Sequence, residues 1–331
     1  MALISPKDVA RLNNHALRAI LNALLTTEAD KNKVPLTDLD LTSRDNDPDA
    51  GIDGRIKWPQ GVNHDVFRPG AVVVQFKSGK IKKGELLREF IKSGVQDTLK
   101  VEKGQYILFV SHDYVAPSRT KQLTALKGLC KRRGIDPGRC KIVYGDQIAR
   151  WISRFPAIAI RPELEKGYPA FATVEQWRQH RNLRNPYKLN AEREEVIKQL
   201  RSFVATTSED NIFRVEGQAG VGKTRMVLEA VNVRGIAERT LYCVDADDPN
   251  AQQLLAMLQA EVEASAVMVF DECERERQET FHSYADQAGG RLRLVCIGPA
   301  EKVLVKPAAS GVFYPLKPLP DAEMRLIYIR A

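Results

Sequence analysis

The segment that most constrains this chain is a glycine-rich stretch of eight residues, Gly217–Thr224, which reads GQAGVGKT. It fits the spacing G-x-x-x-x-G-K-[ST] of a phosphate-binding loop. In such a loop, glycines let the backbone turn sharply and point its N–H groups at a polyphosphate. The flanking sequence predicts a strand at 212–216 and a helix at 225–231, and a helix N-terminus favours anions. The residues predicted to hold a nucleotide are Gly217, Gly220, Val221, Gly222, Lys223 and Thr224.

A second element is predicted to complete the same site. Residues 266–270 (AVMVF) form an apolar run typical of a buried parallel strand, and Asp271 and Glu272 follow it directly. Lys223 can reach the terminal phosphates, and the Thr224 hydroxyl can ligate Mg²⁺. An acid at the tip of the strand can hold the same cation, so Asp271 is the second predicted metal ligand. Glu272 is predicted to orient the attacking water.

The order of elements predicts an α/β protein with two domains and a linker. Residues 1–160 read as α, β, β, α, β, α, β, α, which predicts a mixed sheet with flanking helices. Residues 161–189 contain prolines and a basic polar run and are predicted to be a linker. Residues 190–331 alternate helices and strands, which predicts a parallel, doubly wound sheet around the phosphate loop.

The predicted elements have the following ranges. In the first domain, helices are expected at 9–25, 84–95, 118–133 and 146–155, and strands at 51–58, 71–77, 106–110 and 141–144. In the second, helices are expected at 190–203 and 250–263, and further strands at 240–244 and 291–297. The stretch 316–321 is expected to lead into another strand and a lid.

The positive charge of the chain lies in its first half. Residues 1–160 hold 27 Lys and Arg against 17 Asp and Glu, a net charge of +10, whereas the remainder holds 23 against 25. A basic domain favours a polyanionic partner, most often nucleic acid. No run of about 18 apolar residues is present, so no membrane partner is expected. The five scattered cysteines, without a C-x-x-C pair, indicate reduced thiols and a cytoplasmic protein.

Three residues of the first domain form a candidate metal site. Gln75 and Lys77 lie two residues apart on a predicted strand and therefore share one face. A hairpin from the preceding strand can bring the Asp53 carboxylate beside them. Asp53 and Gln75 would offer hard oxygen ligands for Mg²⁺, and Lys77 would activate a water or stabilise a pentavalent phosphate.

This pattern resembles the PD-(D/E)xK nuclease superfamily, in its restriction-endonuclease-like, Mrr-type branch. The family pattern of Gly, an apolar residue and Asp, followed by (D/E/Q)-x-K, is matched by residues 51–53 and 75–77. The resemblance covers residues 1–160 and implies catalytic roles for Asp53, Gln75 and Lys77. Gln replaces the acid at position 75, which leaves fewer negative charges for a metal. The family sometimes uses an additional acid from the first helix, so the resemblance makes Asp8 a candidate, with Asp49 and Asp65 as weaker helpers.

The succession of a nuclease-like domain and a phosphate-loop domain is similar to the antiviral STAND NTPases of bacteria, the Avs group. The resemblance implies ATP-driven assembly of a homo-oligomer, a tetramer, after a C-terminal region senses a phage protein. The paired nuclease domains would then cut double-stranded DNA. Nothing in the sequence matches that sensor, so the chain is expected to be a fragment or a truncated relative.

Two other functions fit the same motifs. One is an NTP-dependent restriction enzyme, which would require helicase motifs that the sequence lacks. The other is a nucleotide-gated scaffold whose first domain has lost its metal and only binds DNA, and Gln75 keeps this alternative open.

Overall fold

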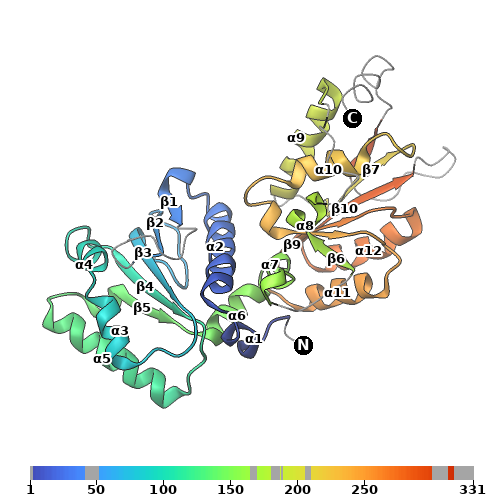
Figure 1. The fold of residues 1–331 in the computed structure, drawn as a ribbon. Helices are drawn as coiled ribbons and strands as arrows, with labels where there is room; N and C mark the ends of the chain where they lie inside the picture. The colour runs from blue at the N-terminus through green and yellow to red at the C-terminus, as the bar shows by residue number, and fades with distance from the viewer. Residues whose placement is uncertain are drawn as a thin grey trace. The chain divides into compact units, whose positions relative to one another are not determined.

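The structure is a computed structural model in which the chain forms two compact units, residues 2–153 and 154–331. Each unit is built around its own β-sheet (Figure 1). The first unit ends at Ser153, seven residues before the predicted domain boundary. The structure describes residues 3–41, 52–164, 170–179, 187, 189–205, 210–299 and 312–316.

The sheet of the first unit has five strands in the order β1-β2-β3-β4-β5. The strands β1, β2 and β3 pair antiparallel, and β3, β4 and β5 pair parallel. The sheet is therefore mixed, as the sequence predicted, with one additional strand of three residues, β1, that was not predicted. The strands are β1 Leu39–Leu41, β2 Gly54–Trp58, β3 Gly70–Lys77, β4 Gln105–Val110 and β5 Cys140–Val143.

Helices cover both faces of this sheet. Side chains of α3, α4 and α5 pack with Val73 and Leu108 on one face. On the other face, Trp151 of α6 stacks on Phe109, and α2 contacts β3. Figure 1 shows α2 on the opposite side of the sheet from α3 and α5. The helices are α1 Pro6–Ala10, α2 Asn14–Lys31, α3 Lys83–Phe90, α4 Ser93–Lys100, α5 Ala116–Arg132 and α6 Gly145–Ser153.

Two predicted helices of the first unit are each divided in the structure. The helix predicted at 9–25 is interrupted at Asn13, whose side chain accepts a hydrogen bond from the backbone N–H of Ala16 (2.8 Å) and starts α2. The helix predicted at 84–95 ends at Phe90, and α4 begins at Ser93. Apolar spacing continued across both breaks, so the pattern alone did not reveal them.

The sheet of the second unit has six strands in the order β11-β7-β10-β9-β8-β6. The first five pair parallel, and only β6, at the edge, is antiparallel. The parallel sheet predicted around the phosphate loop is present, and β10 lies between the loop strand β7 and the acid strand β9. The strands are β6 Phe171–Thr173, β7 Ile212–Gly217, β8 Thr240–Cys243, β9 Ala266–Phe270, β10 Leu292–Pro299 and β11 Val312–Pro315.

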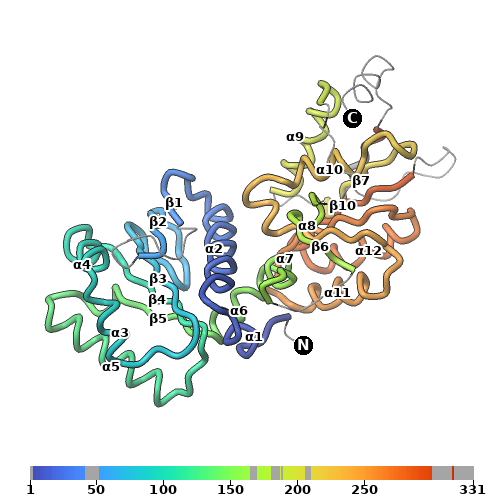
Figure 2. The backbone as a smooth tube through the Cα atoms, viewed as in Figure 1, coloured from blue at the N-terminus to red at the C-terminus, as the bar shows by residue number. Residues whose placement is uncertain are grey.

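The second sheet is also covered on both faces. Apolar side chains of α8, α9 and α10 form one core with Val215, Val269 and Val295. The helices α11 and α12 pack against each other on the other face (Figure 2). There, Phe281 of α12 contacts Phe270. Helix α12 was not predicted. The helices are α7 Pro156–Ala159, α8 Val174–Arg178, α9 Ala191–Ala205, α10 Lys223–Val231, α11 Pro249–Ala260 and α12 Arg275–Gln287.

Part of the predicted linker belongs to this second fold. Within 161–189, β6 pairs with β8, and Trp177 of α8 is buried in the core. Strand β11 ends at Pro315, immediately before the stretch 316–321 that was expected to lead into another strand. Residues 317–321 lie outside the described residues. None of the helices in the described parts of the chain is long and apolar enough to cross a membrane.

A pair of glycine substitutions tests the packing of the first unit. A Cβ atom added at Gly145, at the start of α6, would lie 2.2 Å from the carbonyl oxygen of Ser111. Gly145→Ala is therefore expected to lower the free energy of unfolding by about 1–3 kcal/mol. At Gly128 of α5 the nearest atom would lie 3.6 Å away. Gly128→Ala is expected to raise the free energy of unfolding by about 0.5–1 kcal/mol, because alanine favours a helix.

The free energies can be measured by urea-dependent hydrogen exchange in peptides from β4. Equal stability of the two variants would contradict the close approach of α6 to Ser111.

Candidate functional site

The phosphate loop has the backbone that its sequence predicted. Strand β7 ends at Gly217 and α10 begins at Lys223. Gly220 and Gly222 have φ angles of 79° and 89°, in the left-handed region that favours glycine. At Gly217, a Cβ atom would lie 2.7 Å from the carbonyl oxygen of Leu316. The three glycines are thus required by the turn and by the close approach of the chain after β11.

The loop presents donors that an anion could use. Among the described residues, none accepts a backbone hydrogen bond from the N–H groups of residues 219–222. Lys223 Nζ donates to the carbonyl oxygens of Gly217 (2.8 Å) and Gln218 (3.0 Å) and so lies over the loop. Burial lowers the pKa of Lys223, and the charges of Asp271 and Glu272 oppose that shift. The loop thus combines oriented N–H groups with one cation, as a polyphosphate requires.

Arg193 of α9 supports the loop, although the sequence analysis did not identify it. Its guanidinium donates to the carbonyl oxygen of Val221 (2.6 Å), and the residue is 4% exposed. The contact fixes the loop one residue before Gly222. Arg193 lies 28 positions from Val221 in a helix without a recognisable motif, so only the tertiary structure could identify it.

The predicted metal ligands meet at the carboxyl edge of the sheet. The Thr224 hydroxyl donates to Asp271 Oδ2 over 2.9 Å. Mg²⁺ ligands at about 2.0–2.1 Å in neighbouring octahedral positions are themselves about 2.9 Å apart. The two oxygens therefore fit the first coordination sphere of one Mg²⁺. Asp271 Oδ2 also accepts a hydrogen bond from the Tyr242 hydroxyl (2.8 Å), a partner that the sequence analysis did not identify.

Glu272 has an unusual backbone conformation at this edge. Its φ angle is 49°, and its side chain is exposed. A non-glycine residue in this region carries strain of about 1–3 kcal/mol. Cys273 holds the turn, because its N–H donates to Ile297 O (2.8 Å) and its carbonyl accepts from Gln278 Nε2 (2.9 Å). The strained turn leaves the Glu272 carboxylate exposed at the edge of the sheet.

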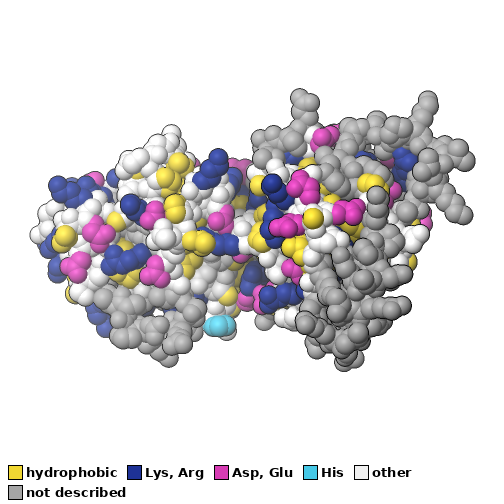
Figure 3. All heavy atoms as spheres, turned by 90° about the horizontal axis from the view of Figure 1, so that it is seen from above, with side chains coloured by type: hydrophobic (Ala, Val, Ile, Leu, Met, Phe, Trp, Pro, Cys, Tyr) yellow, Lys and Arg dark blue, Asp and Glu magenta, His cyan; other side chains and the backbone are white. Residues whose placement is uncertain are grey.

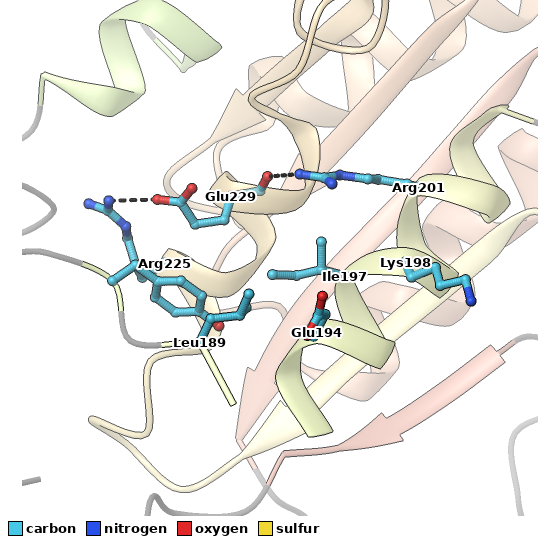
Figure 4. Close-up of a pocket in the computed structure, with 8 residues that line it drawn as sticks. Leu189, Glu194, Ile197, Lys198, Arg201, Arg225 and Glu229 are labelled. Atoms are coloured by element: carbon cyan, nitrogen blue, oxygen red, sulfur yellow. Dashed lines mark hydrogen bonds and ion pairs between the residues drawn. The ribbon is translucent and has the colours of Figure 1, made fainter. Parts of the chain in front are cut away.

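A cavity of ≈650 Å³ lies beside α9 and α10. Figure 4 shows the ion pair of Arg225 and Glu229 (2.6 Å) on one side of it. Arg201, on the other side, donates to the backbone carbonyl of Glu229 (2.9 Å). Arg225 directly follows Thr224 in α10, so the cavity begins next to the phosphate loop. The lining residues are Tyr187, Leu189, Glu194, Ile197, Lys198, Arg201, Arg225 and Glu229.

In the first unit, Asp53 is paired with Arg18 and with a backbone N–H group of β3. Arg18 of α2 makes an ion pair with Asp53 Oδ1 (2.6 Å), and the backbone N–H of Phe76 donates to Oδ2 (2.7 Å). Each of the two ion-paired side chains is 11% exposed. Asp53 is therefore fixed at the end of β3, with Arg18 compensating its charge.

Gln75 and Lys77 instead meet at Glu89 of α3, which the sequence analysis did not identify. Lys77 Nζ lies 2.9 Å from Glu89 Oε1, and Lys92 lies 2.6 Å from Oε2. Gln75 donates its amide N–H to Glu89 and accepts a hydrogen bond from the Tyr106 hydroxyl (2.8 Å). Glu89 thus places a carboxylate beside Gln75.

The predicted metal site of the first unit is only partly assembled by these contacts. The hydrogen bonds and ion pairs above join Gln75 and Lys77 through Glu89, and Asp53 has a different set of partners. Burial raises the pKa of Tyr106 well above its usual range, and Glu89 and Asp53 both add to this shift, so both carboxylates act on the same phenol. Within the described parts of the chain, no group of three His, Cys, Asp or Glu side chains could hold a metal.

Among the weaker candidate acids, Asp8 and Asp65 lie in the part of the chain that the structure describes. Asp8 accepts hydrogen bonds from the backbone N–H (2.8 Å) and hydroxyl (2.6 Å) of Ser5 and caps α1. The backbone carbonyl of Asp65 accepts a hydrogen bond from Lys141. Asp49 and Gly51, the first residue of the proposed nuclease motif, lie outside the described residues.

Comparisons with known proteins add little to this geometry. No family model and no curated protein sequence matches the chain. Among solved structures, it is similar to one described as "Structure of C. elegans PCH-2", with 13% sequence identity and a TM-score of 0.32. The match covers 45% of this chain and 49% of that one, so it spans about half the length of the PCH-2 chain.

Substitution of Glu272, whose backbone is in the left-handed region, tests the nucleotide site. Glu272→Asn is expected to leave ATP binding and thermal stability unchanged, because asparagine tolerates the left-handed backbone. If Glu272 orients the attacking water, as the sequence predicts, ATP hydrolysis is expected to fall by about 100-fold or more. Glu274→Asn, in the same turn, is the matched control and should hydrolyse ATP at the parental rate. Hydrolysis that persists in Glu272→Asn would contradict the role of Glu272.

The Glu89 cluster predicts a dependence of stability on pH. Burial by itself raises the pKa of Glu89, but hydrogen bonds from Lys92 and Lys77 outweigh it, so the pKa lies below its usual range. A lowered pKa stabilises the fold above the unfolded value of about 4.3, and this contribution is lost as pH falls through the folded pKa. Glu89→Gln should therefore unfold at a lower temperature than the parent at pH 7, and the difference should shrink below about pH 4.

Thermal unfolding between pH 7 and pH 3, followed by hydrogen exchange in peptides from the first unit, measures this difference. Glu85→Gln, on the same helix and partly exposed, is the control and should show little difference from the parent at any pH. A gap between parent and Glu89→Gln that stays constant over this range would show that the ion pairs of Glu89 do not stabilise the unit.

Proposed function

We propose that this protein is an antiphage defence effector, an Mg²⁺-dependent endonuclease that cleaves double-stranded DNA and is controlled by ATP. The observation that carries the nucleotide part of the proposal is the hydrogen bond between Thr224 and Asp271 (2.9 Å). It joins the phosphate loop to an acid at the carboxyl edge of a parallel sheet, where such folds bind nucleotides.

In this proposal, the residues of the second unit have separate roles in ATP binding and hydrolysis. The loop N–H groups and Lys223 hold the β- and γ-phosphates. The Thr224 and Asp271 oxygens hold Mg²⁺, which neutralises the charge that develops on the phosphates. Glu272 orients the water that attacks the γ-phosphate. The cavity beside Arg225 receives the nucleoside, because its apolar and polar lining suits an aromatic base and a ribose.

The residues of the first unit support phosphodiester cleavage in two ways. Lys77 ends the central strand β3, and Glu89 fixes its ammonium group 2.9 Å from a carboxylate oxygen. A fixed ammonium can stabilise the negative charge of a pentavalent phosphate. Glu89 also supplies a carboxylate next to Gln75, where the family pattern more often has an acid. Asp53, Gln75 and Glu89 are the residues that would hold Mg²⁺ in this unit.

The segment after β3 supports DNA as the substrate. From Lys77 to Lys92, both included, the chain has six Lys and Arg against two Glu. All the cations after Lys77 in this segment are exposed: Lys80, Lys82, Lys83, Arg88 and Lys92. On the face drawn in Figure 3, Lys and Arg side chains alternate with Asp and Glu and form no continuous basic patch. DNA binding in this proposal therefore depends on the local cluster at the end of β3 rather than on a broad basic surface.

The biological part of the proposal rests on the order of the two units. A nuclease-like unit followed by an ATP-binding unit suits an effector whose cutting is switched on by assembly. Binding of a phage protein by a C-terminal sensor would allow ATP-driven formation of a tetramer. Neighbouring nuclease units would then cut both strands of DNA. An NTP-dependent restriction enzyme is an alternative, and ATP turnover stimulated by DNA would favour it.

One observation favours a second function, a nucleotide-controlled scaffold that binds DNA without cutting it. Arg18 pairs with Asp53 at 2.6 Å and occupies the oxygen that a metal would need. A first unit in which this ion pair persists would hold no metal. Arg18 must move away from Asp53 if the unit is a nuclease.

Supercoiled plasmid cleavage in Mg²⁺ tests the nuclease directly. Nicking by the parent protein in Mg²⁺ and ATP is expected, and Asp53→Ala and Lys77→Ala should each lower its rate by about 100-fold or more. Lys57→Ala, on an exposed site of β2, is the matched control and should cut at the parental rate. Cleavage that is unchanged in Lys77→Ala would refute the proposed site. DNA binding that weakens with salt, without nicking in any condition, would establish the scaffold instead.

A further inference from the structure

Tyr242 of β8 is a buried residue outside the sequence motifs, and it contacts the predicted metal ligand Asp271. The residue is 7% exposed, and its hydroxyl donates to Asp271 Oδ2 over 2.8 Å. The same oxygen accepts the Thr224 hydroxyl over 2.9 Å. The remaining oxygen, Oδ1, accepts from the backbone N–H of Glu272 (3.0 Å). Asp271 is thus fixed by three donors, and Tyr242 is the one supplied by a strand without a known motif.

The ring of Tyr242 is itself held by the segment that precedes α9. The indole of Trp177 stacks on it, with ring centroids 3.9 Å apart and an angle of 8° between the rings. Trp177 is 2% exposed. In the sheet, Ala172 of the edge strand β6 lies opposite Tyr242. Residues 171–178 therefore enclose Tyr242 from the edge of the sheet and from one face.

The start of α8 is fixed locally, which makes this enclosure rigid. The N–H of Gln176 donates to the Thr173 hydroxyl oxygen (3.3 Å), and the Gln176 side chain accepts from the N–H of Thr173 (2.9 Å). This reciprocal pair sets the direction in which α8 leaves β6. Trp177 is one turn after Thr173, so the cap positions its indole over the ring of Tyr242.

We infer that Tyr242 is a positioning residue for Asp271 and that Trp177 fixes its ring, so that residues 171–178 form part of the nucleotide site. The inference rests on the proposed binding of Mg²⁺ and ATP. The segment belongs to the second unit, where it follows α7 and precedes α9. It has no phosphate-binding motif, and its contribution comes through Tyr242 alone.

The chemistry of the three donors explains why Tyr242 is needed. A tyrosine hydroxyl, with an ordinary pKa of about 10, carries its proton at physiological pH, and here it donates to Asp271 Oδ2. If Thr224 and Asp271 held Mg²⁺, both side chains would be ligands of the cation. Tyr242 would then be the side-chain donor to Oδ2 that is not itself a ligand. Without it, Oδ2 would lose a donor that orients it, and the site would be less well organised for Mg²⁺.

The test compares Tyr242→Phe with the parent in the binding of a fluorescent ATP analogue while Mg²⁺ is titrated. The variant keeps the ring and its stack on Trp177 and removes only the hydroxyl. The Mg²⁺ concentration at half-maximal binding is expected to rise by roughly tenfold, the effect of one hydrogen bond to a charged group. Binding of the analogue in EDTA should be unchanged. A purely structural role for Tyr242 predicts no change in the Mg²⁺ requirement.

Two further variants secure the interpretation. Tyr144→Phe removes a buried hydroxyl of the first unit that donates to Gln122 (3.1 Å), and it should behave as the parent. In an Asp271→Asn background, Tyr242→Phe should have little additional effect, because its partner has changed. Trp177→Leu, which removes the stack, is expected to raise the Mg²⁺ requirement by a few-fold, in the same direction as Tyr242→Phe.

The outcomes separate this inference from the proposed function. If the parent binds no ATP analogue with or without Mg²⁺, the proposed nucleotide site is wrong. If the parent binds it with Mg²⁺ and both Tyr242→Phe and Trp177→Leu keep the parental Mg²⁺ requirement, the inference alone is overturned. An equal shift for Tyr242→Phe in the parent and in the Asp271→Asn background would also overturn it, because the effect would not pass through Asp271.

Discussion

The hydrogen bond from the Thr224 hydroxyl to the Asp271 carboxylate organises the second unit. It joins residues 47 positions apart, and it forms only because β7 and β9 run parallel with β10 between them. The parallel arrangement brings the carboxyl ends of these strands to one edge of the sheet. Changes in the order of the strands, in the left-handed glycines of the loop or in the Arg193 contact would separate the two oxygens. The apolar core formed by α8, α9 and α10 holds in place the strands β7 and β9, which lead to these two residues.

The backbone at the same edge carries strain that the surrounding structure maintains. Glu272 is in the left-handed region, and Cys273 is tied on both sides to β10 and α12. Gly298 allows this contact, because a Cβ atom there would lie 2.8 Å from the carbonyl oxygen of Cys273. Strain of this kind collects at sites where a side chain must face away from the local fold. Here it exposes one carboxylate while the neighbouring carboxylate of Asp271 stays buried.

In the first unit, the charges of two buried carboxylates must be compensated. Asp53 and Glu89 are both buried, and a buried charge is costly unless it is paired. Arg18 compensates Asp53, and Lys77 and Lys92 compensate Glu89. Gln75 bridges Glu89 and Tyr106 without adding a charge. An acid at position 75 would place another negative charge against Glu89, so the glutamine is consistent with the presence of that helix residue.

The sequence by itself determined the phosphate loop, the acid strand and most of the elements, because each depends on local spacing. The turn of Gly217–Thr224 and the apolar run before Asp271 require only the residues within them. Tertiary structure decided which distant side chains complete the sites: Arg193, Tyr242 and Glu89 lie outside any motif, and their roles follow from packing. It also decided that residues 171–178 belong to the second sheet, since pairing of an edge strand leaves little local pattern. Local conformation depends mainly on residues that are adjacent in the sequence. The partner of a buried charge or hydroxyl depends instead on how distant helices and strands pack together.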